Sequence, residues 1–96
     1  MVKNNSDTLH ELMGEIPLEV QLRTKLSVSI ANRIEALMRE AGYSKKQFAE
    51  KLGRRPSEVT KWLSGEHNFT IATLARIGAF FGTQIITIAP DPAKNK

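Results

Sequence analysis

The chain contains no cysteine and only two histidines, and this scarcity excludes several kinds of site. Without thiols there is neither a disulfide framework nor a thiolate metal site. His10 and His67 lie far apart in the sequence, and neither has a second type of metal ligand at a useful spacing. We therefore expect no metal ion and no other cofactor.

Long apolar runs are missing as well. No segment approaches the roughly 20 consecutive apolar residues of a membrane span. The first residues, MVKNNSDTLHELMGEI, have no apolar core of the signal-peptide type, so we expect a cytoplasmic protein with no membrane partner. With 96 residues, of which 41% are apolar, the chain has material for one small hydrophobic core.

The groupings that enzymes use are also absent from the sequence. It has no phosphate-cradling glycine loop, no paired carboxylates and no nucleophile with a neighbouring base. Its acidic residues are scattered along expected helices, and its serines stand mostly at expected helix caps. We therefore do not expect an enzyme.

Positive charge, in contrast, is concentrated in one window. Residues 1–43 carry five Lys and Arg against six Asp and Glu, residues 44–65 carry six against two, and residues 66–96 carry three against two. The middle window alone thus has a charge of +4, equal to that of the whole chain. An ordinary solvated surface is one explanation. A binding site for a polyanion is the sharper one, because clustered cations release counterions from phosphates.

Turn and cap residues divide the chain into helices. Four glycines each follow an apolar-periodic run, where a left-handed residue ends a helix: Gly42, Gly53, Gly65 and Gly82. Ser44 and Gln47 form a capping-box pattern, Pro56 suits a first helical position, and Thr70 is a good N-cap. The expected helices span residues 29–41, 45–52, 56–64 and 71–81.

Apolar residues recur at helical spacing in each of these segments and predict the core. The expected stripes are Ile30, Ile34, Leu37, Met38 and Ala41; Phe48, Ala49 and Leu52; Val59, Trp62 and Leu63; and Ile71, Leu74, Ala75, Ile77 and Phe81. Trp62 continues the stripe that Val59 begins, so we expect it to pack in the core. Gly78, inside a helix, costs about 1 kcal/mol relative to alanine, which indicates a close helix crossing there.

The middle pair of helices, SKKQFAEKLGRRPSEVTKWLSG, predicts a helix, a tight turn at Gly53 and a second helix. Ala49 falls where the two helices must cross closely, and Val59 and Leu63 pack the second helix on the first. The first turn of that second helix then projects outward with basic and hydroxyl side chains. These are donors for the base edges and phosphates of a DNA major groove, which admits one helix.

From about Ile30 to Gly82 the chain resembles the bacterial and phage repressor-type helix-turn-helix domain, the xenobiotic-response-element family. The pattern is SKKQFAEKLG, then RRPSEVTKWLSG, then TIATLARIGAFFG. The stretches SIANRIEALMREAGYS and VTKWLSGEHNFT are most similar to HigA-type antitoxins, the DNA-binding members of toxin–antitoxin pairs. The resemblance implies an all-α helix-turn-helix bundle that binds double-stranded operator DNA.

The resemblance also implies roles for individual residues. The residue that opens the first helix of the motif usually clamps a phosphate, and here it is Lys45. The recognition helix usually opens with a base-reading glutamine, but Pro56 stands there and cannot reach a base edge. We therefore expect base reading by Arg55, Ser57, Thr60 and Lys61. We expect DNA backbone contacts by Ser44, Lys45, Lys46, Gln47, Arg54, His67 and Asn68. For His67, an exposed loop histidine without a role is the alternative.

Residues 1–28 are expected to form an N-terminal helical arm outside the DNA-binding domain of residues 29–82. Two apolar stripes run along it: Leu9, Leu12, Met13 and Ile16, and then Leu18, Leu22 and Leu26. This surface either packs on its own domain as extra helices or forms a docking surface for a toxin. The resemblance implies that such a toxin is a small basic ribonuclease that cleaves messenger RNA.

The stretch TQIITIAP, residues 83–90, predicts a short C-terminal β-strand, followed by a tail at residues 91–96. No other stretch predicts a strand, so we expect pairing between two copies of the chain through Ile85, Ile86, Thr87 and Ile88. Such a homodimer would hold two recognition helices about 34–36 Å apart, one turn of DNA. The edge strand of a toxin's sheet is an alternative partner, and a frayed tail is a further alternative.

These features predict a sequence-specific transcriptional repressor. We expect it to be the antitoxin of a type II toxin–antitoxin pair, which autoregulates its operon and neutralises an mRNA-cleaving toxin. A stand-alone transcriptional regulator without a toxin is one alternative. A protein-interaction module is another, because the same fold serves some coactivators that bind no specific DNA site.

Overall fold

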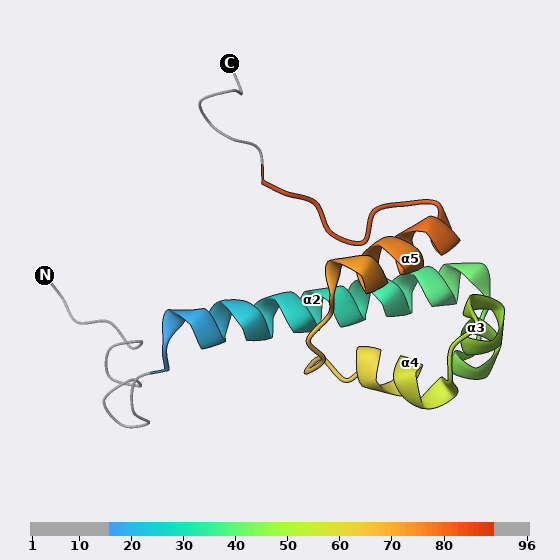
Figure 1. The fold of residues 1–96 in the computed structure, drawn as a ribbon, viewed down its shortest axis with the longest axis horizontal. Helices are drawn as coiled ribbons and strands as arrows, with labels where there is room; N and C mark the ends of the chain where they lie inside the picture. Colours follow the sequence, from blue (N-terminus) through green and yellow to red (C-terminus); the bar gives the residue numbers. More distant parts are fainter. Residues whose placement is uncertain (1–15, 90–96) are drawn as a thin grey trace, which may run out of the picture.

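The computed structural model describes residues 16–89, and these residues contain four α-helices. The helices are α2, Leu18–Ala41; α3, Lys45–Leu52; α4, Pro56–Trp62; and α5, Ile71–Phe81. Figure 1 shows α2 as the long axis of the molecule, with α5 on one side of its C-terminal half and α3 and α4 on the other. The N-terminal half of α2 projects beyond the other helices (Figure 1).

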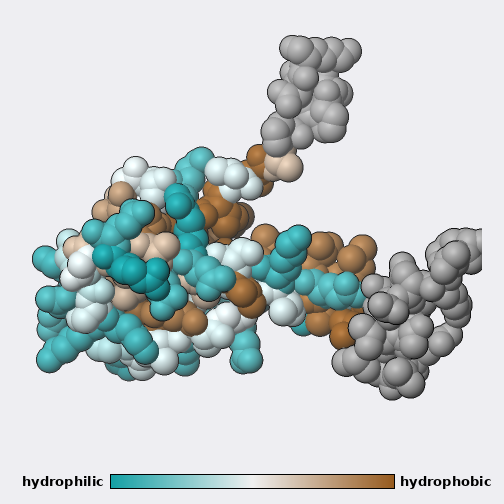
Figure 2. Space-filling view, turned by 180° about the vertical axis from the view of Figure 1, so that it is seen from behind, coloured by the Kyte–Doolittle hydropathy of each residue, from teal (hydrophilic) through white to brown (hydrophobic). Residues whose placement is uncertain are grey.

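Helix α2 is longer than the sequence predicted, because the helix expected over residues 29–41 already begins at Leu18. Its 24 residues include no glycine or proline that would stop it, and Pro17 occupies the N-cap position. The boundary expected between residues 28 and 29 falls inside this helix. Most of the first stripe expected in the arm lies outside the described residues. The second, Leu18, Leu22 and Leu26, is exposed on the projecting half of α2, where Figure 2 shows brown, hydrophobic surface.

The helix caps predicted from the sequence are confirmed. The backbone N–H of Gln47 donates to Ser44 Oγ (3.1 Å), and the backbone N–H of Ser44 donates to Gln47 Oε1 (2.9 Å), which makes a complete capping box at the start of α3. Thr70 Oγ1 accepts from the backbone N–H of Thr73 (3.1 Å) at the start of α5. These bonds satisfy N–H groups that have no partner inside the helix.

The core lies where α2, α3, α4 and α5 meet, and Phe48 is at its centre. Phe48 is fully buried and packs against Trp62, Phe80 and Phe81, with ring centroids 6.2, 5.5 and 5.2 Å away. The other fully buried large side chains are Ile34, Val59 and Ile77. Trp62 is buried, as predicted, and therefore belongs to the packing of the domain.

Three positions expected in the core are exposed instead: Ala41, Ile71 and Ala75. Ile71 is 83% exposed because it stands in the first turn of α5, beyond the end of the packed face of that helix. Ala75 lies about 100° around the helix from the buried Leu74, on the side that faces out. The hydrophobic pattern thus overstated the width of the buried face of α5.

Gly78 does mark a close approach, but the neighbour is not another helix. A Cβ atom at this position would lie 2.5 Å from the carbonyl oxygen of Thr83, in the segment that turns back after α5. The backbone N–H of Thr83 also donates to the carbonyl oxygen of Gly78 (3.0 Å). The expected helix crossing is therefore wrong, and the returning chain is what requires glycine here.

The strand expected over residues 83–90 does not form in the part of the chain that the structure describes, which reaches residue 89. This segment has no neighbouring strand to supply a hydrogen-bonded ladder. It runs back along α5 before leaving the body (Figure 1), and Ile85 enters the core of its own chain. Arg33 on α2 holds it, since Nη2 donates to Gln84 O (2.9 Å) and Thr83 Oγ1 (3.2 Å). No helix among residues 16–89 is long and apolar enough to span a membrane.

Candidate nucleic-acid interface

The site is built on the close crossing of α3 and α4. Ala49 on α3 and Val59 on α4 are both fully buried, so the small side chain of Ala49 lets the two helices approach. Between them Gly53 adopts a left-handed conformation (φ 78°), which costs a residue without Cβ little. The backbone N–H of Arg54 donates to Ala49 O (2.8 Å) and closes the turn. The helix-turn-helix predicted from the sequence is therefore present.

Arg76 on α5 secures this turn, and the sequence analysis missed it. Its Nη2 donates to the carbonyl oxygen of Leu52, the last residue of α3, at 2.7 Å. That carbonyl belongs to the helix end, where no intrahelical donor is available and a positive charge is favourable. This contact joins residues 24 positions apart, so local sequence patterns do not predict it.

The outer face of α4 carries the four residues expected to read bases. Ser57, Thr60 and Lys61 are exposed, and their spacing of three and four places them on one side of the helix. Arg55 is exposed at the N-cap, directly before Pro56. Val59 and Trp62, on the opposite side of α4, are buried and hold the helix on the domain. The structure thus brings Ser57, Thr60 and Lys61 together on one exposed face of α4, with Arg55 exposed at its start. The role of these four residues in base reading stays a prediction.

Glu58 organises the first turn of α4. Its Oε1 accepts from the backbone N–H of Arg55 (3.1 Å), and its Oε2 lies 3.3 Å from Nη1 of Arg54. The hydrogen bond from the Arg55 backbone, assisted by the charges of Arg54 and Arg55, lowers the pKa of the Glu58 carboxyl below its ordinary value. One consequence is that the Arg54 side chain, expected to contact DNA phosphate, is engaged with a carboxylate in this structure.

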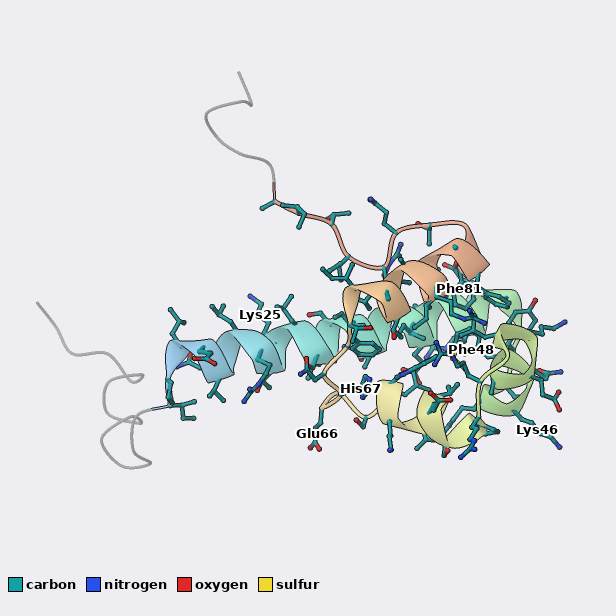
Figure 3. All side chains as sticks on the ribbon, viewed as in Figure 1. Lys25, Lys46, Phe48, Glu66, His67 and Phe81 are labelled. Atoms are coloured by element: carbon teal, nitrogen blue, oxygen red, sulfur yellow. The ribbon has the colours of Figure 1, made fainter. Side chains whose placement is uncertain are left out.

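The residues expected to clamp phosphate at the start of α3 divide into two kinds. Ser44 and Gln47 are exposed, but their side chains are used in the capping box. Lys45 and Lys46 are exposed, and Figure 3 shows Lys46 pointing away from the body of the protein. Two lysines at the first turn of a capped helix thus present their ammonium groups to solvent.

The loop between α4 and α5 carries His67 and Asn68, and it is anchored to α2. Ser27 Oγ donates to the carbonyl oxygen of His67 (3.1 Å). The His67 ring packs edge-on against Phe69, with centroids 4.6 Å apart, so this side chain is half-buried rather than free in solvent. Asn68 is exposed. These two residues lie past the C-terminal end of α4, whereas Arg55 stands at its other end.

The basic window of residues 44–65 therefore has an ordered arrangement. Arg54 is paired with Glu58, and the Lys51 ammonium lies 5.5 Å from the centroid of the Tyr43 ring. The other four cations, Lys45, Lys46, Arg55 and Lys61, are exposed on α3, α4 and the turn between them. Among residues 16–89 no group of three His, Asp or Glu side chains is placed to hold a metal ion.

A comparison with protein families matches residues 34–88 to the helix-turn-helix family. The chain belongs to this family. The match begins within α2 and contains α3, α4, α5 and the segment that follows. Comparisons with curated proteins and with solved structures gave no match.

Membership of the helix-turn-helix family identifies the chain as a DNA-binding regulator of the repressor type. The family is a DNA-binding one and not a catalytic one. In a helix-turn-helix protein the second helix of the motif lies in the major groove with its first residues on the base edges. That helix is α4 here, and its exposed face carries Ser57, Thr60 and Lys61, with Arg55 at its N-cap.

Proposed function

We propose that this helix-turn-helix protein is a transcriptional repressor that binds its own operator as a homodimer and acts as the antitoxin of a type II toxin–antitoxin pair. The observation that carries the first part is the exposed face of α4, with Ser57, Thr60 and Lys61 on one side, the buried Val59 and Trp62 on the other, and Arg55 exposed at the N-cap. A rigidly held helix with donors on its outer face suits the major groove.

Charged and polar groups on α3 and in the loop after α4 support the same proposal. Lys45 and Lys46 stand at the capped start of α3, and Asn68 stands beyond the end of α4. Both sets therefore flank α4. When α4 lies in a groove, cations on either side are suited to the two phosphate backbones that border it.

The homodimer is proposed to form through the segment that follows α5. Ile86 is 40% exposed and Ile88 is 88% exposed, whereas Ile85 is buried in its own chain. Ile85 is therefore better assigned to the core of the monomer, and Ile86, Thr87 and Ile88 are available for contact with a second copy. A two-fold arrangement of this kind pairs the same patch on both molecules.

The homodimer is tested by changing the exposed isoleucines without touching Ile85. The double variant Ile86→Ser, Ile88→Ser should sediment as a monomer with unchanged helix content, because neither side chain is in the core. Operator affinity should fall with the loss of the second half-site. A double variant that stays dimeric would place the two-fold interface elsewhere.

The antitoxin role rests on the resemblance of SIANRIEALMREAGYS and VTKWLSGEHNFT to HigA-type antitoxins. The exposed Leu18, Leu22 and Leu26 on the projecting half of α2 are the docking surface proposed for the toxin. The toxin itself is proposed to be a small basic ribonuclease that cuts messenger RNA.

Co-expression tests the antitoxin role. A reading frame of a small basic protein beside this one should arrest growth when expressed alone, and this chain should relieve the arrest. The variant Leu18→Ser, Leu22→Ser should fail to relieve it while still binding the operator. A lone gene, or a neighbour without toxicity, would contradict the antitoxin role and leave a stand-alone regulator.

A further inference from the structure

A hollow outside the helix-turn-helix motif lies between α2 and the loop that follows α4. It is lined by Arg23, Thr24 and Ser27 of α2 and by Gly65, Glu66 and Asn68 of the loop between α4 and α5. Arg23 precedes the segment matched by the family model, which begins at residue 34. The hollow therefore combines the projecting half of α2, which lies outside the family match, with the loop next to α4.

The two walls of the hollow are held together by direct contacts. Ser27 Oγ donates to the carbonyl oxygen of His67 (3.1 Å). A Cβ atom on Gly65 would meet Cγ2 of Val28 at 3.4 Å, so the loop backbone lies against α2. The loop is also fixed at its start, where Ser64 Oγ donates to Lys61 O (2.7 Å) and accepts from the backbone N–H of Glu66 (3.1 Å). Arg23 and Asn68 thus keep a defined relation to each other and to α4.

The side chains of the hollow offer hydrogen-bond donors suited to an oxyanion. Arg23 supplies a guanidinium, whose planar N–H groups match phosphate oxygens, and Asn68 supplies an amide NH₂. Glu66 also borders the hollow, but Figure 3 shows its side chain pointing away from α2. Arg23 on α2 therefore brings a positive charge to the region beyond the C-terminal end of α4.

The position of the hollow indicates which DNA phosphates lie within its reach. It adjoins the C-terminal end of α4, whereas Lys45, Lys46 and Arg55 stand near the other end of the motif. With α4 in the major groove, the loop after it lies beside one of the two backbones that border the groove. Because the loop packs against α2 at Ser27 and Val28, the projecting half of α2 would lie on the side of the same backbone.

We propose that Arg23, together with Asn68, binds one DNA phosphate beyond the reach of the helix-turn-helix motif, so that α2 extends the DNA footprint of the protein. This inference rests on the proposed binding of DNA through α4. The proposed ligand of the hollow is a backbone phosphate of duplex DNA. Arg23 would therefore contribute to affinity and not to sequence recognition.

Lys25 supplies a matched control for Arg23. It lies two positions further along the same helix, about 200° around it, and Figure 3 shows it on the side of α2 away from the loop that carries Glu66. Arg23→Gln and Lys25→Gln remove the same charge from the same exposed helix segment. The two variants therefore lose the same net charge, so a change of slope confined to Arg23→Gln reports a contact on its side of α2.

The experiment measures binding of the full chain to its own promoter duplex and to a random duplex over a range of salt concentrations. Arg23→Gln should reduce the steepness of log K against log salt by about 0.9 on both duplexes. Between 1 M and 0.1 M salt, the affinity of this variant should therefore rise about eightfold less than that of the wild type. Lys25→Gln should leave the slope unchanged. Ethylation interference should show one flanking phosphate that matters for the wild type and no longer matters for Arg23→Gln.

Two results would overturn the inference: equal slopes for Arg23→Gln and the wild type, or equal changes in Arg23→Gln and Lys25→Gln. Circular dichroism of both variants verifies that α2 is intact. The proposed repressor function is judged separately, by the preference of the wild type for its promoter over the random duplex. A wild type without that preference would contradict the repressor proposal. The salt slopes of the wild type and of Arg23→Gln on the random duplex would still test the role of Arg23.

Discussion

The guanidinium of Arg76 on α5 donates to the carbonyl oxygen of Leu52 at the end of α3, with Nη2 2.7 Å from the oxygen. This bond joins the last helix of the domain to the turn of the helix-turn-helix motif. It satisfies a carbonyl at the negative end of α3, and the same guanidinium lies near Gly53 at the centre of the turn. The orientation of α4 relative to the rest of the domain therefore depends in part on α5.

Arg76→Ala is expected to lower the free energy of unfolding by about 1–2 kcal/mol, because a charged hydrogen bond to an otherwise unpaired carbonyl is lost. Urea denaturation followed by Trp62 fluorescence measures this. Arg39→Ala is the control, since Arg39 makes an exposed ion pair with Glu35 at 3.6 Å, and loss of such a pair should cost about 0.5 kcal/mol or less. Equal costs for the two variants would remove Arg76 from the support of the turn.

Gly78→Ala tests the close approach of the returning chain. At an unhindered helix position this change would stabilise the protein by about 1 kcal/mol. Here the added Cβ would meet Thr83 O at 2.5 Å, so we expect a net loss of about 1–3 kcal/mol in thermal or urea unfolding. Ala75→Gly, at an exposed position of the same helix, calibrates the propensity effect. A more stable Gly78→Ala protein would show that residues 83–85 do not hold this path.

Glu58→Gln is expected to show a stability loss that depends on pH. The backbone N–H of Arg55 and the charge of Arg54 lower the pKa of Glu58 in the folded protein below its ordinary 4.5. The ionised carboxylate therefore contributes stability that is fully present above that ordinary value and is lost as the pH falls through the lowered folded pKa. The difference in unfolding free energy between the two proteins should shrink over that acid range. A difference that is constant with pH would contradict this.

Lys45→Ala and Lys46→Ala are expected to weaken binding to all DNA sequences alike, because both lysines are placed to contact phosphate. Each lost contact should reduce the salt slope by about 0.9 units, as measured by fluorescence anisotropy in a salt titration. Ser44→Ala is a useful comparison, since it removes half of the capping box and should lower stability by about 1 kcal/mol. An unchanged slope would remove the lysine concerned from the interface.

Local sequence patterns predicted the parts of the fold that depend on neighbouring residues. The bounds of α3 and α5 agree with the expected 45–52 and 71–81, because caps and glycines define them locally. The polar face of α4 also followed from local spacing, since burial of Val59 and Trp62 leaves Ser57, Thr60 and Lys61 outside.

Features that depend on distant parts of the chain were not predictable in the same way. The strand expected at residues 83–90 needs a partner ladder, and β-branched residues alone do not supply one. Ile85 packs in the core because the segment after α5 returns along that helix, where Arg33 binds Gln84 O and Gly78 leaves room for the backbone of Thr83. Helix α2 begins at Leu18, eleven residues before the start that the sequence predicts, because its projecting half has no buried face that would extend the core stripe.

Sequence reading by the exposed face of α4 and its N-cap is tested most directly by comparing Arg55→Ala and Lys61→Ala with the wild type on promoter and random duplexes. Each variant should lose about 1–3 kcal/mol of binding free energy on the promoter and relax specificity at one base position, with little change on random DNA. Equal losses on both duplexes would contradict base reading by α4, because Arg55 and Lys61 would then contact only phosphate.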